Sequence, residues 1–411
     1  MKYWSESAFG TPDFSPYPDE LIALRRDLHA EPEIGLALPR TQEKVLAALE
    51  GLPLRITTGR ALSSVVAVLE GGPGPVVLLR ADMDALPVTE TAEIPFASRF
   101  HGIMHACGHD LHTAMLVGAA RLLSARDLPG TVVFMFQPGE EQDHGARLML
   151  AEGVLDAAGR RPVAAYALHV FGSLLPAGRV TTRGGPMLAA SDSLSVTVRG
   201  RGGHGSMPHH ALDPVPAACE MVTALQTFVT RSFDVFDPVV VTVGRFNAGT
   251  AVNVIPAEAR FEATIRSFSP RARARATAGV VHLLENIAAA HHLTVDARIA
   301  PGYPVTENDP AEAALLGETV ERTLGDGRFE TLARPYPGSE DFSYVLGDVP
   351  GALAAIGGCP PGRDPLTAPA NHSADVAYDE DVIADGAALY TALALRRMSA
   401  RSPAASAARP G

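Results

Sequence analysis

The sequence predicts an α/β protein in which a helix-covered mixed sheet is interrupted by an inserted α+β domain. Over the first 170 residues or so, short apolar runs alternate with helical stretches, and the runs are apolar at nearly every position. Such strands are typical of a sheet that is covered on both faces. After Gly184-Gly185-Pro186 the strands instead alternate apolar and polar residues. A chain of 411 residues has room for two or three domains.

The first part of the chain is predicted to begin with two helices between Asp19 and Glu50. They are split at Glu31-Pro32, because proline disfavours a helical conformation in the residue before it. Further helices are expected at about 110–125 and 146–155. The expected strands are the apolar runs SSVVAVLEG, VVLLRADMD, TVVFMFQP and VAAYALHV.

The second part has the element order βαββαβ, with helices at about 214–231 and 271–290. In its strand EARFEATIRSF, Phe261, Ala263 and Ile265 face one way and the polar residues between them face the other, as in a sheet with one solvated side. The order matches the split βαβ unit of ferredoxin-like folds.

The first pattern returns from Gly302 onward, with helices expected at about 309–324 and 379–400. We therefore predict that residues 1–185 and 301–411 form one domain, and that residues 186–300 form the insertion.

Composition and charge exclude several classes of function. Lys and Arg number 34 against 46 Asp and Glu, a net charge of -12, so there is no basic surface for nucleic acid. The sequence contains no run of eighteen uncharged apolar residues and no signal-peptide pattern, so we expect a cytoplasmic protein without a membrane partner. Its 3 cysteines are odd in number and far apart, which does not suit a disulfide framework.

Polar residues follow the predicted strands where catalytic groups of α/β proteins collect. VVLLR leads into Asp82, TVVFMFQP leads into Glu140 and Glu141, and VAAYALHV carries His169. The pair Glu140-Glu141 is equally compatible with a solvated helix start.

The segment before the helix at 110 contains Cys107 and His109, which would project to the same side if the segment is extended. With Glu141, His169 and a C-terminal histidine such as His372, the set comprises one thiolate, three imidazoles and a carboxylate. That is too many ligands for one tetrahedral ion and suits two ions. Cys107 taken alone also fits core packing or a nucleophilic thiol.

Several stretches from about residue 20 to 395 carry these residues and others: DLHAEPEIG, LLRADMDALPVTE, MHACGHDLHTAMLVGAA, FMFQPGEE, ALHV, GRGGHGSMPH, NVIPAEARFEATIRSF, GSEDFS and NHSAD. In this order they resemble the M20 metallopeptidase family. The resemblance is to its amidohydrolase branch of hippurate hydrolases, N-acyl-L-amino acid amidohydrolases and plant auxin-conjugate hydrolases.

The resemblance implies a role for each matching position. Two divalent ions, Mn²⁺ or Zn²⁺ with Co²⁺ or Ni²⁺ as alternatives, would be bound by Cys107, His109, Glu141, His169 and His372. Asp82 would orient a ligand, and Glu140 would be the general base.

The inserted domain would be a lid and dimerisation domain. Its His204 would stabilise the oxyanion, and in dimeric relatives this residue comes from the partner subunit. Asn253 and Arg266 would contact the carboxylate end of the substrate.

The predicted function is metal-dependent cleavage of the amide bond of N-acyl-L-amino acids, such as N-acetyl or N-benzoyl derivatives, by a metal-bridging water that Glu140 activates. A small-peptide metallopeptidase of the same family is the main alternative. A thiol hydrolase acting through Cys107 and a non-catalytic metal-dependent binding protein are the others. The expected partners are the small-molecule substrate and a second copy of the chain, with a homodimer through the inserted domain or a higher oligomer.

Overall fold

The computed structural model describes residues 18–399, and these fall into two compact units. The first unit comprises the chain up to Gly185, Glu307–Ala333 and the chain from Tyr344 onward. The second comprises Pro186–Thr306 and Arg334–Ser343. The insertion that we predicted spans 186–300, and the observed unit extends to Thr306 and also takes in the later segment. Residues 1–17, in which we expected no signal peptide, lie outside the described part of the chain.

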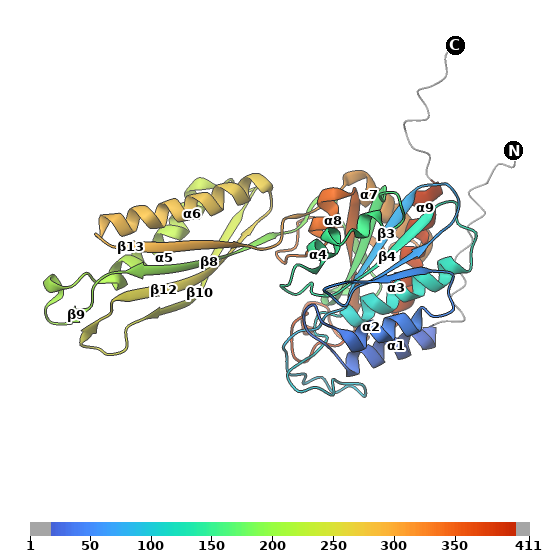
Figure 1. Ribbon diagram of the computed structural model, residues 1–411, viewed down its shortest axis with the longest axis horizontal. Helices are drawn as coiled ribbons and strands as arrows, with labels where there is room; N and C mark the ends of the chain where they lie inside the picture. Colours follow the sequence, from blue (N-terminus) through green and yellow to red (C-terminus); the bar gives the residue numbers. More distant parts are fainter. Residues whose placement is uncertain (1–17, 400–411) are drawn as a thin grey trace, which may run out of the picture. The chain divides into compact units, whose positions relative to one another are not determined.

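A mixed sheet of eight strands forms the centre of the first unit, in the order β1-β2-β4-β3-β5-β16-β6-β15. Its strands β3 and β4 are labelled in Figure 1. Strands β4, β3, β5 and β16 run parallel to one another, whereas β2 and β6 pair antiparallel with β4 and β16. Every residue of β3, β4 and β16 is buried, so both faces of the sheet are covered. The strands are β1 (Arg55–Thr58), β2 (Val65–Leu69), β3 (Val76–Asp82), β4 (Thr131–Gln137), β5 (Ala164–Pro176), β6 (Val180–Thr182), β15 (Phe329–Thr331) and β16 (Gly351–Cys359).

The helices of this unit lie close to the predicted positions. They are α1 (Pro18–Ala30), α2 (Pro39–Ala48), α3 (His109–Ser124), α4 (Gly145–Ala151), α7 (Pro310–Leu324), α8 (Ser343–Asp348) and α9 (Val382–Ser399), with one 3₁₀ turn at Val154–Asp156. Helices α3 and α9 pack on each other and on β3 and β5, while α1 packs on α3 and α7 on α9. Helix α3 is thereby fixed against β3 and β5.

The second unit has the predicted order βαββαβ and an antiparallel sheet in the order β10-β12-β8-β13. Alternate residues of β12, including Phe261, Ala263 and Ile265, are buried, which confirms the predicted alternation. Its elements are β7 (Gly185–Leu188), β8 (Ala190–Arg199), β9 (Gly203–His204), a 3₁₀ turn (Pro208–His210), α5 (Pro214–Ser232), β10 (Val239–Ala248), β11 (Val254–Ile255), β12 (Glu258–Ser267), α6 (Pro270–Ala290), β13 (Thr294–Pro301) and β14 (Thr306–Asn308).

No helix within residues 18–399 is long and apolar enough to cross a membrane.

Candidate metal centre

Two neighbouring strands of the large sheet end beside the middle of a third. Strand β3 pairs in parallel with β4 on one side and with β5 on the other; β3 and β4 end together, while β5 continues to Pro176 beyond its last pairing with β3 at Ala167. β3 ends at Asp82, β4 leads into Glu140 and Glu141, and β5 carries His169. The sheet therefore brings together residues that are far apart in the sequence, as the strand-end argument predicted.

The segment before α3 is not the extended strand that we expected for Cys107 and His109. Cys107 lies in a turn, and α3 begins at His109. Gly108 has a φ of 81°, and a Cβ atom there would lie 2.3 Å from Cγ1 of Val170. The two donors reach the same place because a glycine permits this turn, and not because side chains alternate along a strand.

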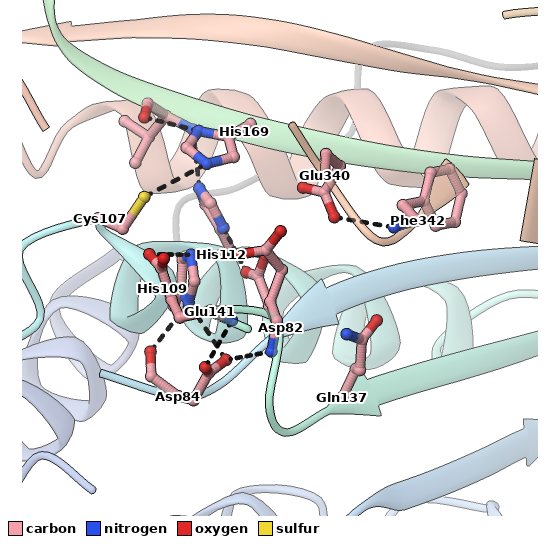
Figure 2. Close-up of polar contacts among 12 residues, drawn as sticks. Asp82, Asp84, Cys107, His109, His112, Gln137, Glu141, His169, Glu340 and Phe342 are labelled. Atoms are coloured by element: carbon pink, nitrogen blue, oxygen red, sulfur yellow. Dashed lines mark hydrogen bonds and ion pairs between the residues drawn. The ribbon is translucent and has the colours of Figure 1, made fainter. Parts of the chain in front are cut away.

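Five side chains supply two overlapping groups of donor atoms. Four of them, Cys107, His109, Glu141 and His169, are labelled in Figure 2. Cys107 Sγ lies 3.5 Å from His169 Nε2 and 3.3 Å from His372 Nε2. Glu141 Oε1 lies 3.2 Å from His372 Nε2 and 4.0 Å from His109 Nε2. One group contains Cys107, His109 and His169, and the other contains Cys107, Glu141 and His372. Cys107 belongs to both groups, so it would help to hold an ion in either of them.

His372 reaches the cluster from the loop before α9 through an unusual backbone conformation. Its φ is 71°, in the left-handed region, and its backbone N–H donates to the carbonyl of Ala106 at 2.8 Å. The side chain of Asn371 donates to the carbonyl of Val170 at 2.8 Å and accepts from the N–H of Gly172 at 2.9 Å. These bonds tie the loop to the turn before α3 and to β5, and so hold His372 against Cys107.

The imidazoles are held in the form that a metal ligand requires. His109 Nδ1 donates to the carbonyl of Asp84 at 2.9 Å, and His169 Nδ1 donates to the carbonyl of Val170 at 3.0 Å. In each neutral ring the lone pair then lies on Nε2. His109 Nε2 is buried and has no hydrogen-bond partner among the described residues.

The charges of the cluster also suit a cation. Burial raises the pKa of the Cys107 thiol, but the imidazoles of His169 and His109 outweigh burial and hold that pKa well below its usual range. Burial and the nearby Cys107 thiolate raise the pKa of Glu141 to about 7. Hydrogen bonds to Cys107 and Glu141 raise the pKa of His372 to about 10. A thiolate and a carboxylate crowded in a buried site gain most from a bound cation, so the residues fit two divalent ions.

Asp84 is a functional residue that our sequence reasoning missed. One carboxylate oxygen accepts from the backbone N–H of Glu140 at 2.9 Å, and the other accepts from the N–H of Glu141 at 3.0 Å. Its own carbonyl holds His109, as described above. Asp84 follows Asp82 by two residues in the stretch LLRADMDALPVTE, and that spacing was the available signal. The structure also shows that Glu140 and Glu141 do not start a helix, since α4 begins at Gly145.

Asp82 lies behind the cluster. Its carboxylate binds Arg80 Nη1 at 2.8 Å and His112 Nδ1 at 2.6 Å, and it approaches His109 Nε2 only to 3.6 Å. Burial raises the pKa of Asp82, but Arg80, His109 and His112 outweigh burial and hold it well below its usual range. The bond that orients the ring of His109 comes from Asp84, whereas Asp82 contacts His112, which our sequence reasoning had not singled out.

A buried polar network holds α1 against the start of α3. Arg25 Nε lies 2.8 Å from Asp110 Oδ2. His29 Nδ1 donates to the same oxygen at 2.8 Å, and His29 Nε2 lies 3.0 Å from Glu90 Oε1. Burial lowers the pKa of His29, but the contacts with Asp110 and Glu90 outweigh it and raise the pKa above its usual value. Because Asp110 follows His109, this network supports the helix start that carries a metal donor.

The other predicted residues lie in the second unit. His204 on β9 is exposed and pairs with Val254 on β11, and the N–H of Gly205 donates to the carbonyl of Asn253 at 2.8 Å. His204 and Asn253 are therefore neighbours at one small two-stranded antiparallel sheet, β9-β11. Arg266 lies near the end of β12 and donates to Ser339 Oγ at 3.0 Å.

The fold and the donor set together define a dinuclear metal-binding protein of the α/β class, with a buried carboxylate, Glu140, beside the metal donors. Residues 78–396 match the model of peptidase family M20/M25/M40. The chain belongs to this family of hydrolases, which confirms the resemblance in its sequence motifs.

Known proteins of the family share most of the length of this chain. The chain is 36% identical to the Arabidopsis thaliana protein IAA-amino acid hydrolase ILR1-like 4, over 92% of this chain and 86% of the relative. It is 37% identical to N-acetylcysteine deacetylase of Bacillus subtilis (strain 168), over 82% of this chain and 88% of the relative. Among solved structures it resembles the Bacillus subtilis YXEP protein, a dinuclear metal binding peptidase from the M20 family. That likeness has a TM-score of 0.81 and 31% identity, and covers 94% of this chain and 100% of the other.

Proposed function

We propose that this protein is a binuclear metal-dependent amidohydrolase that cleaves the amide bond of N-acyl-L-amino acids to a carboxylic acid and a free amino acid. The observation that carries the proposal is the placement of Glu140, a buried carboxylate directly before a metal donor and next to two overlapping donor groups. The relatives named IAA-amino acid hydrolase and N-acetylcysteine deacetylase support an N-acyl amino acid as substrate.

The residues of this chain divide the chemistry among them. When bound, divalent ions would polarise the amide carbonyl and lower the pKa of a bound water. Glu140 would take the proton of the attacking water and return it to the nitrogen of the leaving amine. Its backbone is fixed by Asp84, which keeps the carboxylate from moving away between these two transfers. Cys107 and the imidazoles favour Zn²⁺, whereas the Glu141 carboxylate also suits Mn²⁺, so these two are the ions that we propose.

The inserted unit supplies the remaining proposed roles. His204 Nδ1 accepts from the N–H of Ser206 at 3.1 Å, so a neutral His204 carries its proton on Nε2. That nitrogen can donate to the oxyanion that forms during amide cleavage. We propose this role for His204, from this chain or from a second copy, and substrate-carboxylate contacts for Asn253 and Arg266.

A panel of substrates with added Mn²⁺ or Zn²⁺ tests the proposal. N-acetyl, N-benzoyl and indoleacetyl amino acids should release free amine, and a chelator should stop the release. Hydrolysis of dipeptides but not of acyl amino acids would support a small-peptide metallopeptidase, an alternative favoured by the likeness to the YXEP protein, a dinuclear metal binding peptidase. Activity that survives the chelator and is lost with iodoacetamide would point to thiol chemistry at Cys107. Metal binding without any amine release would support a non-catalytic metal-dependent binding protein.

We also propose a homodimer through the inserted unit. Among the described strands, β10 pairs with β12 alone, so its other edge is open. Large apolar side chains are exposed nearby in the sequence: Val240, Phe246, Val252 and Val254. An open edge with exposed apolar residues is typical of a surface that pairs with another chain. Sedimentation of the wild type and of Val252→Asp should show a dimer that the substitution weakens, and a wild type that sediments as a monomer would refute it.

A further inference from the structure

The buried ring of His112 lies among the candidate metal donors, but both of its nitrogens are hydrogen-bonded to other groups. Nδ1 donates to Asp82 Oδ1 at 2.6 Å, and Nε2 accepts from the backbone N–H of Val170 at 2.7 Å (Figure 2). The centroid of the ring lies 4.8 Å from that of His169 and 5.4 Å from that of His109. With both nitrogens engaged, His112 has no lone pair left for an ion.

We propose that His112 is a positioning residue that sets the direction of His169, and thereby the affinity for the ion held by Cys107, His109 and His169. This inference rests on the proposed two-ion site.

The peptide on either side of Val170 links the two histidines. His112 holds the N–H of Val170, and the carbonyl of Val170 accepts from His169 Nδ1 at 3.0 Å. A shift of Val170 would therefore move the backbone of His169 and rotate its ring. Partners of this kind, one step behind a metal ligand, fix the tautomer and the orientation of the ligand.

His112 is itself anchored to the sheet. Asp82, its partner, binds Arg80 Nη1 at 2.8 Å, and Arg80 Nε donates to Gln137 Oε1 at 2.9 Å. All of these side chains are buried. The chain of bonds starts on β4, crosses β3 and ends on β5 through a residue of α3. His112 therefore fixes the backbone next to His169 relative to the strands of the sheet.

The second donor group has supports that do not pass through Val170. The backbone of Glu141 is held by Asp84, and that of His372 by Ala106. Asn371, next to His372, does bind the carbonyl of Val170, but it is also held by the N–H of Gly172. Loss of that bond should weaken binding of the ion on the His169 side and leave the other ion in place.

Two substitutions each remove a different hydrogen bond of His112. In His112→Asn the amide nitrogen can still donate to Asp82, but the acceptor for Val170 is lost. In His112→Gln the amide oxygen can still accept from Val170, but the donor to Asp82 is lost. Tyr390→Phe is the matched control, because the Tyr390 hydroxyl also joins buried backbone groups of β3 and β5, donating to the carbonyl of Arg80 at 2.6 Å and accepting from the N–H of Leu168 at 2.8 Å.

The experiment measures the ions bound by the full-length chain without substrate. Each apoprotein is titrated with Co²⁺, and the metal content is measured after dialysis. The wild type and Tyr390→Phe should retain two ions. His112→Asn should bind the ion on the His169 side about 10–100-fold more weakly and retain one ion, and His112→Gln should lie between. The thiolate absorption of Co²⁺ should persist in His112→Asn, because Cys107 still serves the other group.

Wild-type affinity for both ions in the two His112 variants would overturn the inference, as would loss of an ion from Tyr390→Phe equal to that from His112→Asn. If His112→Asn does not fold, His112→Gln decides: weakened binding of one ion supports the inference, and wild-type binding overturns it. A wild type that never binds two ions overturns both this inference and the two-ion site. A wild type that binds two ions but hydrolyses no acyl amino acid refutes the proposed substrate and leaves the role of His112 standing.

Discussion

The substitution Asp84→Asn tests how the catalytic loop is held. The side chain is buried, and each of its two oxygens accepts a different backbone N–H, from Glu140 and from Glu141. Asparagine has the same shape but a single oxygen. Its amide nitrogen would face one of the two N–H groups, leaving that donor without an acceptor.

The structure allows an estimate of the cost. A buried N–H without an acceptor costs about 1–3 kcal/mol, and a hydrogen bond to a charged group contributes about 1.5–3 kcal/mol. We therefore expect Asp84→Asn to lower the free energy of unfolding by about 2.5–6 kcal/mol, measured by urea denaturation of the metal-free protein. Because Glu140 loses its anchor, kcat/KM for an N-acyl amino acid should fall by about 10²-fold.

Asp309→Asn is a matched control. At the N-terminus of α7, one oxygen of Asp309 accepts both N–H groups, from Ala311 at 2.8 Å and from Glu312 at 3.0 Å. Asparagine can make the same two bonds, so this variant should keep its stability within about 0.5 kcal/mol and its full activity. If Asp84→Asn matches Asp309→Asn in both measurements, the carboxylate does not hold the loop in the way we describe.

Three further predictions follow from the site. Glu140→Gln should abolish amine release while the metal content stays at the wild-type value, and a turnover rate that is unchanged would contradict its role as base. Because the folded-state pKa of His29 is raised, its contribution to stability is fully present below pH 6.5 or so and is lost as the pH rises through the folded-state value. The difference in unfolding free energy between the wild type and His29→Gln should therefore be larger at pH 6 than at pH 9, and an equal difference would show that His29 does not titrate as described. Gly108→Ala should cost about 2–5 kcal/mol of unfolding free energy, because the left-handed conformation and an overlap with a valine side chain both oppose a Cβ atom. Gly102→Ala, at a φ of 83° with open space around it, should cost only about 1–2 kcal/mol, and equal costs would exclude the overlap as a cause.

The position of some candidate metal donors is predictable because it depends on chain direction. A polar residue directly after an apolar strand lies at the carboxyl edge of the sheet, whichever strands prove to be neighbours. Glu141 follows β4 and Asp82 ends β3, whereas His169 lies within β5, two residues beyond the last residue of β5 that pairs with β3. The element order of the inserted unit is predictable for the same reason, since the alternation of residues in β12 is local.

The residues behind the donors are harder to predict because they act through backbone groups of distant segments. Asp84 binds the N–H groups of residues more than fifty positions away, and Asn371 binds the carbonyl of Val170 on β5. Nearly every residue has a backbone N–H and a carbonyl, so the sequence does not show which of them a distant side chain will bind. The turn at Gly108 was missed for a similar reason: the pair Cys107 and His109 is the one that converges, but through a glycine in a left-handed conformation that the alternation argument did not consider.

The contrast between His109 and His112 shows where sequence reasoning must stop. The two residues are three positions apart on α3, so they lie on the same face of the helix, and the sequence offers no reason to treat one as a donor and the other as its support. What separates them is the strand that each ring meets. His109 donates from Nδ1 to the carbonyl of Asp84, and its Nε2 lies at the donor cluster. His112 instead donates from Nδ1 to Asp82 and accepts from the N–H of Val170 at Nε2. The hydrogen-bond partners of each histidine therefore depend on where β3 and β5 lie in the sheet, and these partners set the proposed role of each ring.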